Sequence, residues 1–250
     1  MNKIKTTILF LVLTLVISGC VTTSKQITSS ENKSFTTVEV GDIRKMPISE
    51  FHKNRIAAFN QENLASLQNG TVFLGDSLTE GFDLNKYFPG KKAINRGMSG
   101  DTLGGALRCG CYDRLSSCVY NLNPDQVVMM IGINDLSYFR QDTTFRTKLD
   151  QYDNLANAIR KGLPNKKLFF VSVLPTRDKW AFANRNIIIL NEHIQRAAKR
   201  NNAIYLDAHS QLKDSKGELK EEYSKDGLHL TEAGYTALAN FYKPQVFGEK

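Results

Sequence analysis

Short apolar runs bounded by turn-forming residues recur along the chain, and each has the length of a β-strand. The runs are Thr71–Leu74, Ala93–Asn95, Gln126–Ile131, Leu168–Val173 and Ala203–Leu206. Between and around them, apolar residues repeat at the three-to-four-residue spacing of one helix face. Three such faces carry Ile56, Phe59, Leu64 and Leu67, then Phe145, Leu149, Tyr152, Ala156, Ile159 and Leu163, then Ile187, Leu190, Ile194 and Ala197. The pattern therefore predicts strands that alternate with helices.

The run Gln126–Ile131 is apolar on both of its faces. A parallel sheet that is covered by helices on each side needs such strands. In an antiparallel sheet with one face in solvent, apolar and polar residues alternate along each strand. We therefore expect an α/β fold, a flavodoxin-like three-layer α/β/α sandwich with a central parallel sheet of about five strands. Ligands in such sheets bind beyond the carboxyl ends of the strands, so the residues directly after each run are the first candidates for a site.

The composition indicates one folded domain. The chain has 250 residues, of which 41% are hydrophobic and 23% charged, with 17 Gly and 6 Pro. These proportions allow one sizeable core and exclude disordered and fibrous classes. The net charge of +8 is spread along the chain rather than gathered in long basic runs, so we expect no nucleic-acid partner.

The first residues have the pattern of an export signal. Lys3 and Lys5 precede the apolar run Ile8–Ile17, which is too short to span a membrane, and small residues lead to Cys20. The stretch Ile17–Cys20 resembles the lipobox of bacterial lipoproteins. The resemblance implies that residues 1–19 are a signal peptide and that Cys20 is lipidated and becomes the mature N-terminus.

Residues 20–45 are expected to be this lipidated cysteine and a flexible tether. The stretch Val21–Thr37 holds nine Ser or Thr among 17 residues, and it has too few large apolar side chains to drive collapse. It would let a single domain over residues 46–250 stand off a membrane to which acyl chains bind it. The expected location is the bacterial cell envelope, at a periplasmic or extracytoplasmic face. The choice of membrane and the oligomeric state stay open.

Three further cysteines, Cys109, Cys111 and Cys118, lie within ten residues of one another. In an oxidising envelope, one disulfide would join Cys118 to Cys109 or Cys111 and leave one thiol over. Reduced, partly buried cysteines on a helix are the alternative. No histidine lies near this cluster and thiolate zinc sites usually have four ligands, so we expect no metal.

Ser77 directly follows the first predicted strand, in the stretch Gly75-Asp76-Ser77-Leu78. A serine that leaves a strand at a sharp turn can project its hydroxyl with backbone N–H groups behind it. To act as a nucleophile it needs a base, and it needs donors for the charge that develops on the attacked carbonyl oxygen. A serine that merely caps a helix is the structural alternative.

The four histidines narrow the choice of base. His52 and His193 fall within predicted helices. His209 follows the last strand, where no acid except Asp207, across a turn, has a spacing that could orient it. His229 differs, because the tight loop that begins at Asp226 lets the carboxylate accept from Nδ1–H while Nε2 takes the serine proton. We predict His229 as the base and Asp226 as its partner.

The residues after the second and third strands could stabilise the developing charge. Gly97 follows the second strand, and a glycine lets a backbone N–H approach a ligand closely. Asn134 follows the third strand, and its side-chain amide would be a second donor at the same edge. Asp76 and Asp135, beside these residues, are expected to brace their turns by hydrogen bonds.

These blocks, in this order, resemble the SGNH hydrolases, also called the GDSL esterases and lipases, over roughly residues 71–242. The resemblance implies catalytic roles for Ser77, Asp226 and His229 and donor roles for Gly97 and Asn134. It also implies that the backbone N–H of Ser77 completes the oxyanion hole. The stretch Asn95–Thr102 and the helix before the first strand are similar to the platelet-activating-factor acetylhydrolase-like and carbohydrate acetylesterase branches.

The sequence as a whole predicts a serine esterase that needs no metal or organic cofactor and cleaves short acyl esters, acetyl foremost, carried on an alcohol such as a sugar. Its expected partners are a small acyl-ester substrate and, through Cys20, a membrane. A lysophospholipase or thioesterase for longer acyl chains is an alternative, and so is a glycan-binding lipoprotein that does not hydrolyse. Tyr138 and Trp180 follow strand ends and could floor the substrate pocket, with core packing as the alternative.

Overall fold

The computed structural model describes residues 50–64, 69–104, 113–138 and 142–249. Five strands form one sheet in the order β2-β1-β3-β4-β5, and each pair of neighbours is parallel. The strands are β1 (Thr71–Gly75), β2 (Ala93–Gly97), β3 (Gln126–Met130), β4 (Lys167–Val171) and β5 (Ile204–Leu206). Every strand begins and ends within two residues of its predicted run. The predicted fold class is confirmed.

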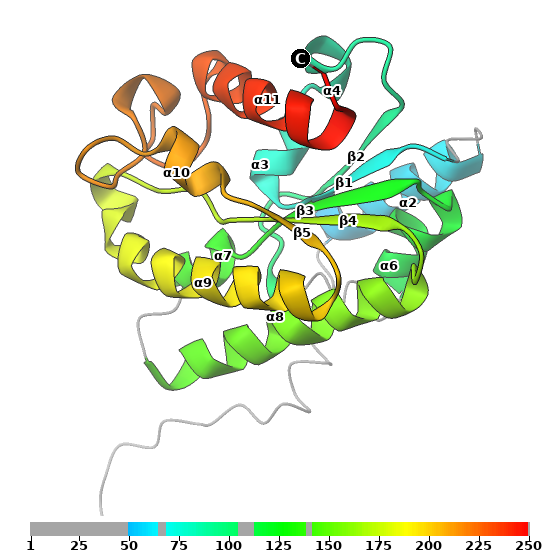
Figure 1. The fold of residues 1–250 in the computed structure, drawn as a ribbon, viewed down its shortest axis with the longest axis horizontal. Coiled ribbons are helices and arrows are strands. Elements are labelled where there is room, and N and C mark those ends of the chain that lie inside the picture. The colour runs from blue at the N-terminus through cyan, green and yellow to red at the C-terminus, as the bar shows by residue number, and fades with distance from the viewer. Residues whose placement is uncertain (1–49, 65–68, 105–112, 139–141, 250) are drawn as a thin grey trace, which may run out of the picture.

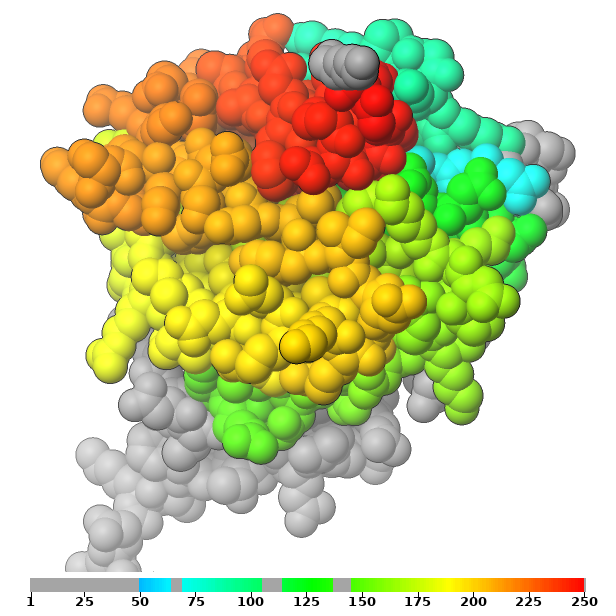
Figure 2. All heavy atoms as spheres, in the orientation of Figure 1, coloured from blue at the N-terminus to red at the C-terminus, as the bar shows by residue number. Residues whose placement is uncertain are grey.

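Helices cover both faces of this sheet, as Figure 1 shows. They are α2 (Glu50–Leu64), α3 (Ser77–Glu80), α4 (Leu84–Tyr87), α6 (Asp113–Cys118), α7 (Ile133–Tyr138), α8 (Asp142–Gly162), α9 (Asn184–Arg200), α10 (Ala208–Leu212) and α11 (Glu232–Phe247), with 3₁₀ turns η1 (Tyr120–Leu122), η2 (Asp178–Ala183) and η3 (Glu221–Tyr223). On one face lie α10 and α11, which pack side by side in the space-filling view of Figure 2. On the other lie α2, α6, α8 and α9.

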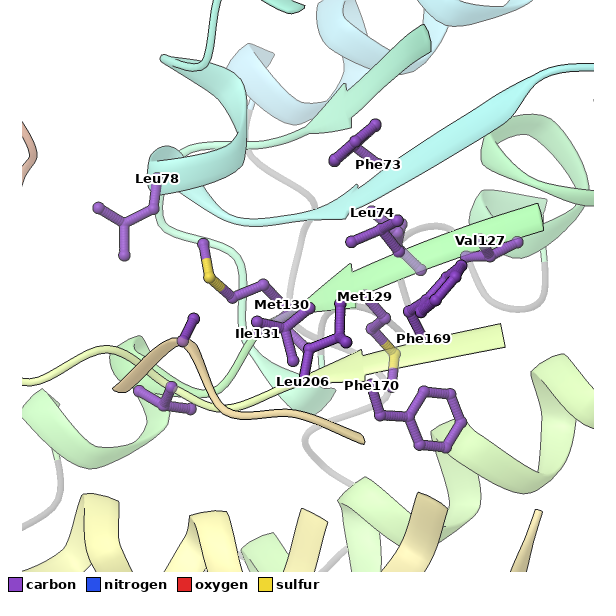
Figure 3. Close-up of a cluster of buried hydrophobic side chains, with 14 of the residues drawn as sticks. Phe73, Leu74, Leu78, Val127, Met129, Met130, Ile131, Phe169, Phe170 and Leu206 are labelled. Carbon is purple, nitrogen blue, oxygen red and sulfur yellow. The ribbon is translucent and has the colours of Figure 1, made fainter. Parts of the chain in front are cut away.

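Successive residues of a strand point to opposite faces, and this alternation builds the two halves of the core. On the α11 side, the ring centroid of Phe73 lies 5.9 Å from that of Tyr242. On the α8 side, Tyr152 meets Phe170 edge to face with 6.1 Å between the ring centroids. Figure 3 shows the central part of this core around β1, β3 and β4. Because both faces are covered, strands that are apolar on both faces are stable here.

The apolar helix faces predicted from spacing are the buried ones. In α8, Tyr152, Ala156 and Ile159 are buried, and the four stripe residues of α9 have no exposed surface. The stripe of α2 is buried at Phe59. Leu67, the last residue expected in that stripe, lies outside the described residues.

Cys118 corrects the expected disulfide. It ends α6 as a free thiol with 0% of its surface exposed, among core side chains. Burial raises the pKa of this thiol, which disfavours the reactive thiolate. Cys109 and Cys111 lie outside the described residues. The alternative of a reduced, buried cysteine on a helix therefore holds for Cys118.

No helix in the part of the chain that the structure describes has both the length and the apolar character needed to cross a membrane. The predicted signal segment and tether, residues 1–45, fall outside the described ranges and stay predictions.

His209, in α10, makes the stability of the fold depend on pH. Its side chain is buried and burial lowers its pKa, so the folded protein binds fewer protons there than the unfolded chain. Its contribution to stability is therefore lost as the pH falls below the ordinary value of 6.5. The melting temperature should fall less between pH 7.5 and pH 5 in His209→Gln than in the parent protein. His193→Gln is the control, because His193 has a carboxylate partner, with its Nε2 2.8 Å from Asp153 Oδ1. An equal acid-induced fall of the melting temperature in the parent and in His209→Gln would contradict the account.

Candidate active site

Ser77 stands at the first position of α3, two residues beyond the end of β1. Asp76 caps this short helix: its side chain accepts from the N–H of Leu78 at 3.0 Å, and its carbonyl accepts from those of Thr79 and Glu80. The N–H of Ser77 itself has no acceptor among the described residues, as expected at the first turn of a helix. The serine thus carries a hydroxyl and an open N–H at the same point.

His229 and Asp226 meet this hydroxyl in a continuous chain of hydrogen-bond distances. Ser77 Oγ lies 3.1 Å from His229 Nε2, and His229 Nδ1 lies 2.7 Å from Asp226 Oδ2. All three predicted residues are therefore together, although about 150 positions separate the serine from the other two. The side chain of His229 is about half exposed, so a substrate can approach it from solvent.

Asp226 is held ionised by its surroundings. Partial burial acts to raise its pKa, but the His229 ring and the N–H groups of Leu228 and His229 donate hydrogen bonds that hold the pKa well below the ordinary value. An ionised carboxylate next to Nδ1 fixes the proton of the neutral ring on Nδ1. This leaves Nε2 as an acceptor that faces the serine hydroxyl.

The loop that carries Asp226 and His229 is anchored by two residues that the sequence analysis missed. The Ser224 hydroxyl donates to the His229 carbonyl at 2.8 Å and accepts from the N–H of Gly227. Arg177 donates its backbone N–H to the Gly227 carbonyl at 2.9 Å. Because Arg177 lies in the segment after β4, the strand-end rule was the signal that could have found it.

Asn134 lies at the first turn of α7, directly after β3, and is buried. Its side-chain amide donates to the carbonyl of Asp101 at 2.8 Å. This bond sets the orientation of the amide and places it beside the loop that follows β2. The predicted donor from the third strand therefore meets the predicted donor loop from the second strand.

Gly97 does not supply the donor of that loop, contrary to the sequence-based expectation. Its N–H already donates to the side-chain oxygen of Asn95 at 2.8 Å. A Cβ at Gly97 would lie 2.1 Å from the backbone nitrogen of Glu80, so this position is glycine because β2 presses against α3.

Gly100, three residues further on, is the better placed glycine. It sits in a four-residue turn that the N–H of Asp101 closes on the Met98 carbonyl at 3.1 Å. Its φ of +76° is the value that the third position of a type II turn requires, and glycine adopts it without strain. Gly100 is exposed, and its N–H has no acceptor in the described ranges.

Buried charges lie beneath these turns. Asp101 pairs with Arg114, and Asp135 pairs with Lys148 at 3.3 Å while it accepts from the N–H of Leu103 at 2.8 Å. Burial raises the pKa of Asp76 to about 7, and the carboxylates of Asp101 and Asp135 add to the shift. The bonds to Leu78 and Leu103 are bracing contacts of the kind expected for Asp76 and Asp135.

The two predicted pocket residues stay predictions. Trp180 is partly buried in η2 and packs against the core. The centroid of its ring lies 6.4 Å from that of the exposed Phe182 ring. Tyr138 is the last residue of α7, and its side chain lies outside the described part of the structure. Across the described ranges, no group of three or more His, Cys, Asp or Glu side chains could hold a metal ion.

The sequence matches the GDSL-like Lipase/Acylhydrolase family over residues 73–237, and the chain belongs to this family. It is accordingly a carboxylic ester hydrolase. A curated relative is the N-acylneuraminate cytidylyltransferase of Escherichia coli O18:K1:H7, 33% identical over 118 residues. That alignment covers 46% of this chain and 26% of the relative, so the chain spans about a quarter of the relative's length.

Solved structures share the fold. A Streptococcus pneumonia structure described as a platelet activating factor superposes with a TM-score of 0.70 at 24% identity, over 82% of this chain and 97% of that one. A GDSL-like lipase from Bacteroides thetaiotaomicron superposes with a TM-score of 0.64 at 25% identity, over 80% of this chain and 99% of that one. The acetylxylan esterase Axe2 from Geobacillus stearothermophilus superposes with a TM-score of 0.56 at 20% identity, over 72% of this chain and 95% of that one.

The carboxylate of Asp226 can be tested by Asp226→Asn. The amide cannot stabilise a protonated His229 ring and favours the wrong tautomer, so kcat should fall by about 10³–10⁴-fold with little change in folding. Steady-state kinetics with an activated ester, together with a melting curve, checks this. A variant that keeps more than a tenth of the parent kcat would show that Asp226 does not support the histidine.

Proposed function

We propose that this protein hydrolyses short acyl esters, acetyl foremost, carried on carbohydrate, through an acyl-enzyme on Ser77. The observation that carries the proposal is the chain of hydrogen-bond distances from Ser77 Oγ through the His229 ring to the Asp226 carboxylate. Nucleophile, base and orienting acid need this arrangement, and the ring is open to solvent.

In the proposed first step, Ser77 Oγ bonds to the ester carbonyl carbon while His229 Nε2 takes the hydroxyl proton. The imidazolium then gives this proton to the departing alkoxide as the ester C–O bond breaks. Water repeats the sequence on the acyl-enzyme: the ring takes a proton from the water, and the acid product leaves as the proton returns to Ser77. No metal or organic cofactor enters this scheme.

Three donors would stabilise the negative oxygen of the tetrahedral intermediate. They are the N–H of Ser77, the side-chain amide of Asn134 and, in place of Gly97, the N–H of Gly100. The proposal is supported by the open N–H groups of Ser77 and Gly100, and by the bond that holds Asn134 against the turn of Gly100. Loss of one such donor commonly costs about 10²–10³-fold in kcat.

The packing behind Ser77 closes one route that a long acyl chain could take. The side chains of Leu78, Met130, Ile131, Val173 and their neighbours fill the space between the serine turn and the strand ends, and they leave no room for a water molecule. Figure 3 shows Leu78, Met130 and Ile131 in this position. A long acyl chain could therefore not pass between these side chains without displacing them.

The names of two relatives support a carbohydrate as the alcohol part of the ester substrate. Axe2 is named as an acetylxylan esterase, and the likeness to it is one of fold. The curated relative is named for an N-acylneuraminate and matches over 26% of its length. Acetylated sugars are therefore the first substrates to test.

An acyl-chain series with p-nitrophenyl esters tests the acyl preference. We expect kcat/KM to be highest for acetate and to fall by about tenfold or more at octanoate, because the filled space cannot take the added methylenes. A fluorophosphonate probe should label the parent protein but not Ser77→Ala, which should also lose about a thousandfold or more in activity. Rising kcat/KM toward octanoate would favour a lysophospholipase or thioesterase, and an unlabelled, inactive parent would favour a glycan-binding protein.

We further propose that Cys20 is lipidated and tethers the enzyme to a bacterial envelope membrane, with residues 1–19 removed. The support is the Ile17–Cys20 stretch and the Ser/Thr-rich segment after it. On expression in a bacterium with labelled palmitate, the parent protein should carry label and sediment with membranes, whereas Cys20→Ser should carry none. Label that persists in Cys20→Ser would contradict this anchor.

A further inference from the structure

We infer that Glu80 is a positioning residue for the proposed reaction, because its carboxylate fixes the turn of Gly100 relative to Ser77. The inference rests on the proposed function, in which Ser77 attacks and Gly100 donates to the oxyanion. Glu80 is the last residue of α3, one helical turn after Ser77, and its backbone N–H donates to the Asp76 carbonyl at 2.9 Å. Its backbone therefore moves with the serine.

The carboxylate of Glu80 holds Ser99, the residue before Gly100. Glu80 Oε2 accepts the Ser99 backbone N–H at 2.5 Å and the Ser99 hydroxyl at 2.7 Å. Both bonds are partly buried and have an ionisable acceptor, which makes them stronger than neutral ones when the carboxylate is charged. The peptide unit that joins Ser99 to Gly100 contains the proposed donor N–H, so these bonds act one peptide away from it.

Arg55 of α2 braces the same carboxylate from the opposite side. Its Nε lies 3.8 Å from Glu80 Oε1 and donates to the Gly97 carbonyl at 3.3 Å, while the guanidinium packs over the ring of Phe59. The carboxylate thus lies between a cation from α2 and the turn after β2.

Asn95 makes a separate connection that does not depend on Glu80's carboxylate. Its amide donates to the carbonyls of Thr79 and Phe82 at 2.7 and 3.0 Å, and its oxygen accepts from Gly97. These bonds fix the end of β2 against α3. The Glu80 carboxylate therefore has the narrower task of fixing the turn of Ser99 and Gly100 beyond that strand end.

A displaced donor should affect the transition state more than the ground state, because the negative oxygen exists only after attack. We therefore expect kcat to fall by about 10–100-fold in Glu80→Ala, with KM within about twofold of the parent. Glu80→Gln keeps an acceptor oxygen but loses the charge, so its kcat should fall by only about 2–10-fold. Ser99→Ala keeps the bond from its backbone N–H to Glu80, and its kcat should fall by a factor similar to that of Glu80→Gln.

The control variant is Glu62→Ala. Glu62 is also a carboxylate paired with an arginine between α2 and β2, since its Oε2 lies 2.6 Å from Arg96 Nη1, but it makes no contact with Ser99. Its loss should lower the melting temperature and leave kcat unchanged. Glu80→Ala that keeps the parent kcat, or changes only KM, would overturn the inference, and so would an equal fall of kcat in Glu62→Ala.

Failure of the inference is distinct from failure of the proposed function. In the first case, the parent is active, Ser77→Ala is inactive, and the Glu80 variants behave as the parent. In the second case, the parent itself is inactive or Ser77→Ala keeps its activity. If Glu80→Ala does not fold, Glu80→Gln and Ser99→Ala decide the question, and parent-like kcat in both would overturn the inference.

Discussion

Parallel strands that end at a common edge of the sheet are the constraint on which this site depends. The pairing of β1 with β2 and β3 sets Gly75 opposite both Gly97 and Met130. The serine turn, the Gly100 turn and the Asn134 helix therefore all leave the sheet at one level. The loop of His229 reaches the same edge because Arg177, beyond β4, holds Gly227.

Buried charges hold this edge together. The Arg114 guanidinium, which is almost fully buried, pairs with Asp101 and donates to the carbonyls of Gly75 and Arg96 at 3.4 and 3.3 Å. It thus joins the ends of β1 and β2 to the turn that follows β2. Buried ion pairs are costly to desolvate and add little net stability, so their effect here is to fix geometry. Asp76, whose pKa burial raises to about 7, lies within this network and carries the serine.

The parts of the fold and site that follow from local pattern could be predicted from sequence. Short apolar runs bounded by turn-forming residues located all five strands, and the run that is apolar on both faces indicated a covered parallel sheet. Ser77 and Asn134 were found because they follow such strands directly. Asp226 and His229 were found because a three-residue loop closes a hydrogen bond between them.

What could not be predicted depends on contacts between distant segments. Spacing alone cannot distinguish a glycine that packs against a helix, as Gly97 does, from one that opens a turn, as Gly100 does. The bonds of Glu80 to Ser99 join separate parts of the chain and leave no periodic pattern. For the same reason the burial of Cys118 as a free thiol was not evident from its neighbours in the sequence.

The most direct measurement is a crystal structure of the adduct formed between Ser77 and a small alkyl phosphonate, whose tetrahedral phosphorus imitates the intermediate. The account predicts a phosphoryl oxygen within about 2.7–3.1 Å of Ser77 N, Gly100 N and Asn134 Nδ2, with His229 Nε2 beside Ser77 Oγ. A phosphoryl oxygen turned toward solvent, or bound by Gly97 in place of Gly100, would contradict it.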